Sequence, residues 1–349
     1  MAAREIFGLN RQLENRNKFL NQVFGKYFSD DVVEEILNDP NGALLGGKRR
    51  VVTVLLSDLR GFSAISEGLE PSDLTDMLNN YFSSMEEIIV SHRGTIIEFM
   101  GDGILAVFGA GADPADHERD AVCCALQMQN AMEGVNEYNL SRKYPILMMG
   151  IGLDSGEAYV GNIGSEKMMR YNVIGRVVSR CSRIESYTVG GQVFASGRIA
   201  DAVPGLLTGP IRNVMAKGIS EPLSFYEIKA CGDITNTGAN HKAKMYVPGQ
   251  TAEFCLYVVE DKKIGDRAYH FTVLGAGKIE IAGRLEDGVT LEPYSDVCLE
   301  GTVMDNGYFN DLYGKITGIS DGVYRITITH AGETVTDWIK ECEENGSEY

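Results

Sequence analysis

The segment Val51–Leu56 constrains the fold of this chain most strongly, because its sequence VVTVLL is apolar at all but one position. Such a run is typical of a strand that is covered on both faces. Apolar residues then recur at helical spacing between Leu74 and Ile89, and Pro71 is placed for the first turn of that helix. Strands and helices alternate from there onward. We therefore expect an α/β or α+β domain of about 180 residues.

The remaining elements of this domain follow from the same patterns. Gly101-Asp102-Gly103 separates two β-prone segments and predicts a hairpin turn. We expect strands at Thr95–Met100, Ile104–Phe108, Ile146–Leu153, Tyr159–Ile163 and Gln192–Ala195, and helices at about Asp116–Val135 and Val177–Tyr187.

Three further regions flank the domain, which we place at residues 47–230. Residues 1–46 carry an approximate apolar stripe and are expected to form a helical segment that packs on the domain or on a partner chain. Residues 231–244 are expected to be a linker. Residues 245–349 contain short β-prone segments divided by turns, which predicts a small β-barrel or sandwich. These segments are Phe254–Val259, Tyr269–Val273, Lys278–Ile281, Val289–Leu291, Val297–Val303, Gly314–Ile319 and Val323–Thr329.

Composition narrows the class of partners. The chain has 32 Lys and Arg against 49 Asp and Glu, a net charge of −17, which opposes binding to nucleic acid or to anionic membranes. The sequence has no apolar run long enough for a transmembrane helix and no secretory signal, so we expect a cytoplasmic protein. The seven cysteines include no CxxC pair and are expected to be free thiols rather than zinc ligands.

The first candidate site directly follows the apolar strand, in the sequence SDLRGFS of Ser57–Ser63. Asp58 stands at the end of the strand, and the chain then turns through Gly61 towards a helix. A carboxylate in this place can hold a hard cation, while free N–H groups of the turn and of the helix start can hold phosphate. This motif alone is weak, because a strand-end aspartate is equally consistent with a purely structural role.

Asp102 strengthens the motif, since it lies 44 residues after Asp58 in a turn that brings its carboxylate to the same place. A turn aspartate is usually only a turn former. Two carboxylates at adjacent strand ends, however, suit two-metal phosphoryl transfer. A third region adds Asn172 and, one helical segment later, Arg183, which could stabilise charge on a transferring phosphate. Taken separately, Arg183 is better explained as part of a surface salt bridge.

Longer stretches extend these motifs and cover about residues 47–229: VTVLLSDLRGFSAISE, GTIIEFMGDGILAVFG, DHERDAVCCALQMQ, MGIGLDSGEAYVGNIGSEKMMRYNVIG, SRIESYTVGGQVFAS and AKGISEPLSFYEI. In this order they resemble the class III nucleotidyl cyclases, the adenylate and guanylate cyclase catalytic domain family. The preceding FGKYFSDDVVEEIL resembles the helical lead-in of bacterial members. The resemblance implies an α+β fold with a ferredoxin-like core, which works as a head-to-tail homodimer with active sites at the interface.

The resemblance also implies roles for individual residues. Asp58 and Asp102, with the carbonyl of Leu59, match ligands of two Mg²⁺ or Mn²⁺ ions per active site. Gly61, Phe62 and Ser63 match the phosphate-binding turn, and Lys217 matches a lysine that binds the triphosphate. The reaction implied is attack of the ribose 3′-hydroxyl on the α-phosphate of a nucleoside triphosphate, which gives a 3′,5′-cyclic nucleotide and pyrophosphate.

The remaining matches fall in the half of the site that the opposing protomer supplies. Glu98 and Asn172 match the base-reading positions, and Arg183 matches the transition-state arginine. Ser179 stands where the family has an asparagine that orients the ribose, and Arg176 stands where an aspartate is usual. These two departures keep open the alternative of a degenerate, non-catalytic dimerisation or nucleotide-sensing module.

Two points of specificity stay open from the sequence. Glu98 favours GTP, because a carboxylate accepts from the N1 and 2-amino donors of guanine, but bacterial relatives with glutamate there are also called adenylate cyclases. The C-terminal region loosely resembles a PilZ barrel, yet it lacks that family's RxxxR and DxSxxG motifs. We therefore expect it to contact a protein partner or to stabilise the dimer rather than to bind cyclic-di-GMP.

Overall fold

The computed structural model describes residues 45–111, 116–165, 167–214, 222–238, 244–260, 263–286, 288–303 and 307–349. The expected N-terminal helical segment, apart from its last two residues, lies outside these ranges, and so does Lys217. Among the described helices, none is both long enough and apolar enough to cross a bilayer.

The first part of the described chain is built around strand β1 (Gly46–Leu59). Its neighbours are β4 (Met149–Ser165) and β3 (Gly103–Phe108), both antiparallel to it. The sheet continues in the order β10-β9-β6-β4-β1-β3-β2, with β5 on β4 and with β7 and β8 on β9. The other strands are β2 (Thr95–Met100), β5 (Met168–Ile174), β6 (Val193–Ser196), β7 (Leu206–Thr208), β8 (Arg212–Val214), β9 (Leu223–Cys231) and β10 (Ile234–Thr235).

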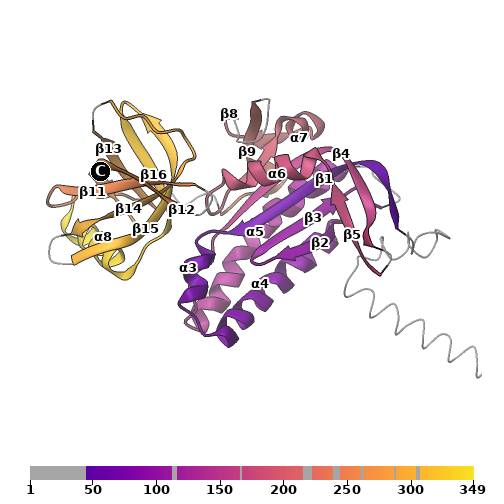
Figure 1. Ribbon diagram of the computed structural model, residues 1–349, viewed down its shortest axis with the longest axis horizontal. Coiled ribbons are helices and arrows are strands. Elements are labelled where there is room, and N and C mark those ends of the chain that lie inside the picture. Colours follow the sequence, from indigo (N-terminus) through magenta and orange to yellow (C-terminus); the bar gives the residue numbers. More distant parts are fainter. Residues whose placement is uncertain are drawn as a thin grey trace, which may run out of the picture.

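Helices cover both faces of β1, as its apolar sequence predicts (Figure 1). On one face α4 (Pro71–Ser91) and α5 (His117–Ser141) pack over Leu55 and Leu59. On the other, α6 (Arg176–Ser186) packs over Val52 and Val54. The shorter helices are α3 (Phe62–Glu67) and α7 (Gly197–Ala202). The α+β fold is therefore a sheet between two helical layers.

Several element predictions need correction. The two strands expected at 146–153 and 159–163 are one strand, β4, because β1 pairs with it without interruption from Gly46 to Leu59. Helix α5 runs six residues beyond the expected end, to Ser141. The first residues of the expected linker instead pair with β9, since Ile234 and Thr235 lie opposite Cys231 and Ala230. All seven cysteines are free.

The C-terminal part closes into a barrel in the order β11-β12-β13-β16-β15-β14. Val289–Leu291, expected as a strand, is not one, and the Leu291 N–H donates to the Tyr324 hydroxyl at 3.2 Å instead of joining a ladder. Helix α8 (Glu333–Asn345) was not foreseen and packs Trp338 into the barrel core. The strands are β11 (Ala252–Glu260), β12 (Lys263–Ala276), β13 (Glu280–Leu285), β14 (Asp296–Val303), β15 (Gly307–Ser320) and β16 (Val323–His330).

Candidate active site

Asp58 and Asp102 lie side by side, as the hairpin predicts. Asp58 is next to last in β1, and Asp102 occupies the turn between β2 and β3. The Leu59 N–H donates to Asp102 Oδ2 at 3.2 Å and so holds the second carboxylate against the first. At Gly103 a Cβ atom would lie 2.9 Å from the Ser57 carbonyl oxygen and 3.6 Å from Asp58 Oδ1. Glycine thus lets the turn approach the end of β1 closely.

The pair of carboxylates suits a hard divalent cation. Burial, followed by the negative charge of Asp58, raises the pKa of Asp102 to about 6, so the two groups repel when both are ionised. The described residues contain no cluster of three or more His, Cys, Asp or Glu at a metal-binding spacing. Mg²⁺ and Mn²⁺ are commonly held by one or two carboxylates, with waters and substrate phosphates completing the shell. The donor set therefore fits such an ion.

The raised pKa of Asp102 predicts a pH-dependent response to metal. Without metal, the folded chain binds a proton at Asp102 more tightly than the unfolded chain does, because the pKa of Asp102 is raised. This proton stabilises the fold at acid pH, and the stabilisation is lost as pH rises through about 6. A cation must displace the proton of Asp102, so Mn²⁺ should raise Tm by several degrees at pH 7.5 and hardly at all at pH 5. Thermal melts with and without Mn²⁺ measure this. In Asp102→Asn the difference between the two pH values should vanish; an equal Mn²⁺ shift at both pH values in the unmodified chain contradicts the assignment.

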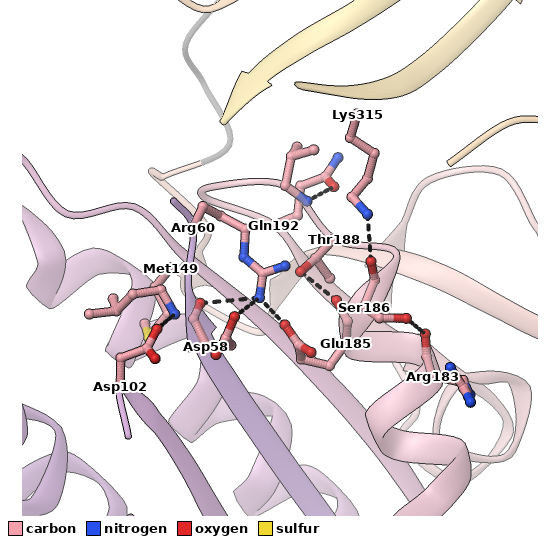
Figure 2. Close-up of polar contacts among 12 residues, drawn as sticks. Asp58, Arg60, Asp102, Met149, Arg183, Glu185, Ser186, Thr188, Gln192 and Lys315 are labelled. Carbon is pink, nitrogen blue, oxygen red and sulfur yellow. Dashed lines mark hydrogen bonds and ion pairs between the residues drawn. The ribbon is translucent and has the colours of Figure 1, made fainter. Parts of the chain in front are cut away.

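A buried arginine, which sequence reasoning missed, connects Asp58 to α6 (Figure 2). Arg60 Nη2 donates to Asp58 Oδ2 at 2.9 Å and also pairs with the Glu185 carboxylate. The Arg60 and Glu185 side chains are only 10% and 9% exposed. Burial raises the pKa of Glu185 to about 7, and the nearby Arg60 guanidinium limits this rise. Arg60 uses one oxygen of Asp58 and fixes its orientation.

The turn after Asp58 leads directly into helix α3. Gly61 has φ of 68°, in the left-handed region that favours glycine, and its carbonyl accepts from the N–H groups of Ala64 and Ile65. These are the first hydrogen bonds of α3, which begins at Phe62. Phe62 and Ser63 stand at the first positions of this helix, where backbone N–H groups have no acceptor within the helix itself.

Ser179 and Arg183 belong to a different element from the aspartates. They lie four residues apart on α6, and therefore on one face, and both are exposed. In Figure 2 the Arg183 side chain is directed away from Asp58 and Asp102. Arg176, the other departure from the family pattern, is also exposed, at the first position of α6.

Glu98 and Asn172 lie on β2 and β5. Glu98 pairs with Arg170 Nη1 at 3.1 Å, and both side chains are exposed, at 44% and 67%. Asn172 Oδ1 accepts from the Val173 N–H at 2.7 Å. Because Arg170 and Asn172 are two residues apart in a strand, they share a face of β5. No local sequence pattern marks Arg170, because its contact with Glu98 spans 72 residues of chain.

Comparisons with known proteins identify the family that this part of the chain resembles. Residues 47–218 match the family described as "Adenylate and Guanylate cyclase catalytic domain". The chain is similar to the structure of the guanylyl cyclase Cya2, with 43% identity and a TM-score of 0.54 over 55% of this chain and all of that one. It is also similar to the adenylyl cyclase CyaB from P. aeruginosa, with 30% identity and a TM-score of 0.52 over 54% of this chain and 99% of that one.

Among curated proteins, "Adenylate cyclase 1" of Rhizobium meliloti (strain 1021) is 29% identical over 236 residues, which cover 67% of this chain and 35% of that protein. The chain spans less than half of the length of the curated relatives that it matches, 35% of one adenylate cyclase and 46% of another. On the family match and the complete coverage of Cya2, the chain belongs to the adenylate and guanylate cyclase catalytic domain family.

Proposed function

We propose that this protein is a homodimeric nucleotidyl cyclase, which converts a nucleoside triphosphate, GTP in preference to ATP, to a 3′,5′-cyclic nucleotide and pyrophosphate. The observation that carries the proposal is the contact of Asp102 with the strand end that bears Asp58, within a chain of this family. The product would act as a second messenger. For the barrel, we propose a PilZ-like fold that contacts a protein partner or stabilises the dimer.

In the proposed site, one group of residues binds the metal ions and another binds the triphosphate. Asp58, Asp102 and the Leu59 carbonyl would hold two Mg²⁺ or Mn²⁺ ions, and the N–H groups of Phe62 and Ser63 would bind the triphosphate. Bound cations supply charge neutralisation at the triphosphate and acidify the ribose 3′-hydroxyl. Lys217 is a further proposed triphosphate ligand.

In the reaction, the 3′-oxygen bonds to the α-phosphorus, and the bond from this phosphorus to the bridging β-phosphate oxygen breaks. Pyrophosphate leaves, and the hydroxyl proton passes to solvent. Arg183 would stabilise the negative charge that builds during this exchange, and Ser179 would contact the ribose. Since a serine is shorter than the family's asparagine, we expect slower turnover rather than none.

A second copy of the chain would supply the Arg183 half of each site. Within one chain Arg183 and Ser179 are exposed on one face of α6, and the Arg183 side chain is directed away from Asp58 and Asp102 (Figure 2). Large apolar side chains are also exposed on β2, β4 and β5, which is unusual for a surface that stays in water. They are Phe99, Met100, Tyr159, Met168 and Ile174.

Purified protein incubated with Mn²⁺ and ATP, GTP, CTP or UTP, followed by mass analysis of the products, tests the proposal. We expect cyclic GMP as the major product. The absence of every cyclic nucleotide would favour the non-catalytic alternative, and predominant cyclic AMP would contradict the base preference.

Glu98→Lys is expected to lower the GTP-to-ATP ratio of kcat/KM by about a hundredfold or more. The carboxylate accepts two donors from guanine, whereas lysine offers donors only, and mispaired buried groups discriminate strongly. The exposed ion pair with Arg170 contributes little, so a base can take its place. Arg170→Ala is the matched control, because it removes the ion pair but keeps the carboxylate. A ratio that moves equally in both variants contradicts base reading by Glu98.

A further inference from the structure

A buried lysine joins the barrel to the cyclase domain. Lys315, on β15, is only 2% exposed. Its Nζ donates to the Ser186 carbonyl oxygen at 2.7 Å, at the C-terminal end of α6 (Figure 2). The same Nζ pairs with Asp296 Oδ1 at 2.7 Å. A buried ammonium group is costly unless it is paired and hydrogen-bonded. If the barrel separated from the cyclase domain, Lys315 would lose the Ser186 carbonyl and keep only Asp296. This contact therefore favours the docked arrangement.

An aromatic contact holds the same end of α6. The ring of Tyr294, which comes just before β14, lies 5.6 Å from that of Tyr187, the residue after Ser186. It also lies 6.1 Å from Phe225 and 6.5 Å from Phe194. Arg212 stacks over the Tyr294 ring at 5.3 Å. Two independent barrel contacts therefore hold the last turn of α6.

That last turn carries two groups of the proposed active site. Glu185, next to Ser186, binds Arg60 and through it orients Asp58. Ser186 itself donates its hydroxyl to the Arg183 carbonyl at 2.8 Å. On the other side of Asp58, the Thr329 carbonyl oxygen of β16 would lie 2.5 Å from a Cβ atom at Gly61. The barrel thus touches both segments that flank the metal-binding end of β1.

The charges alternate in sign across this contact. Asp296, Lys315, Glu185, Arg60 and Asp58 follow one another from the barrel to the end of β1. Lys315 acts electrostatically on Glu185, and Asp296 on Arg60. A displaced barrel would therefore change the field at Glu185 and Arg60 as well as the position of α6.

We propose that the C-terminal barrel is a positioning element of the active site, with Lys315 as its positioning residue: by holding the end of α6 it fixes Glu185 and Arg60, and so the orientation of the Asp58 carboxylate. The family match ends at residue 218, before the barrel begins. The inference rests on the proposed function insofar as Asp58 binds a metal ion.

Lys315→Met tests this, because methionine fills similar space without charge or donor. Partners that orient a metal ligand are worth about 10–100-fold in affinity or activity, and we expect the lower end, about tenfold, in both Mn²⁺ affinity and kcat. Free Mn²⁺ is titrated by electron paramagnetic resonance without nucleotide. Lys315→Arg should recover most of the loss. Lys340→Met, which removes an exposed lysine paired with Asp337 on α8, is the control and should match the unmodified chain.

A purely structural role predicts a lower Tm with unchanged Mn²⁺ affinity and kcat at 25 °C, and this outcome overturns the proposal. If Lys315→Met does not fold, Asp296→Asn replaces it, because the Asp296 side chain is 55% exposed and tolerates the change. Its expected effect is a smaller loss of the same kind, and no loss in this variant also overturns the proposal.

Failure of the proposed function is a separate result. In that case the unmodified chain shows no turnover, but Mn²⁺ titration still compares the metal affinity of Lys315→Met with that of the unmodified chain. Hydrogen exchange at the Tyr187 and Thr188 amides, which bond to Ile184 and Glu185, gives a second readout without turnover. Faster exchange together with weaker Mn²⁺ binding in Lys315→Met supports the positioning role of the barrel, whereas unchanged exchange and unchanged binding contradict it.

Discussion

Asp102→Asn is expected to lower kcat by at least about a thousandfold, because it removes one of two charges that would hold the catalytic cations. The substitution keeps the shape of the side chain. In the unmodified chain the Leu59 N–H donates to Asp102 Oδ2 at 3.2 Å, and the amide oxygen of asparagine can accept the same hydrogen bond. The substitution also removes repulsion from Asp58, so the metal-free protein should be at least as stable as the unmodified chain. Turnover with Mn²⁺ and thermal melts without metal measure the two effects.

Asp58→Asn should give a similar loss of turnover, since the amide oxygen can still accept from Arg60 but carries no charge. Asp201→Asn, at an exposed position of α7, serves as the control. A variant of either site aspartate that retains more than about a tenth of the activity would refute the two-metal assignment.

Mixing Asp58→Ala chains with Arg183→Ala chains is expected to restore activity from two inactive proteins. Each site takes the aspartates from one protomer and Arg183 from the other, so a mixed dimer has one intact site and one with both defects. With random exchange about half of the dimers are mixed, which gives about a quarter of the unmodified activity. Activity is measured after subunit exchange has been shown with differently tagged chains.

The matched control for this experiment is a mixture of Asp58→Ala and Asp102→Ala chains. Both aspartates lie in the same half of the site, so neither site of a mixed dimer is intact and no activity should return. Recovery in this control, or none in the first mixture after exchange, would show that the site is not divided in the proposed way.

The sequence alone determined the features that depend on neighbouring residues. The apolar run of β1 predicted a strand covered on both faces, and its residues from Val52 to Val54 are fully buried. Pro71 begins α4, and the glycines around Asp102 form a hairpin turn. Each of these follows from local backbone preferences and side-chain periodicity. The sequence also placed Asp102 in this turn, but its meeting with Asp58 depends on the antiparallel pairing of β1 with β3, in which Ser57 lies opposite Ile104.

Only the tertiary structure decided which distant residues meet. Arg60 and Glu185 are 125 positions apart, and Lys315 lies 129 positions from Ser186. No periodicity encodes such contacts, since they depend on how α6 packs on β4 and how the barrel packs on both. Close packing of α6 is possible because Gly152 has no Cβ, which would lie 2.5 Å from the Glu185 backbone nitrogen. The candidate site residues could thus be proposed from sequence motifs and the family resemblance, whereas the contacts that orient them required the folded chain.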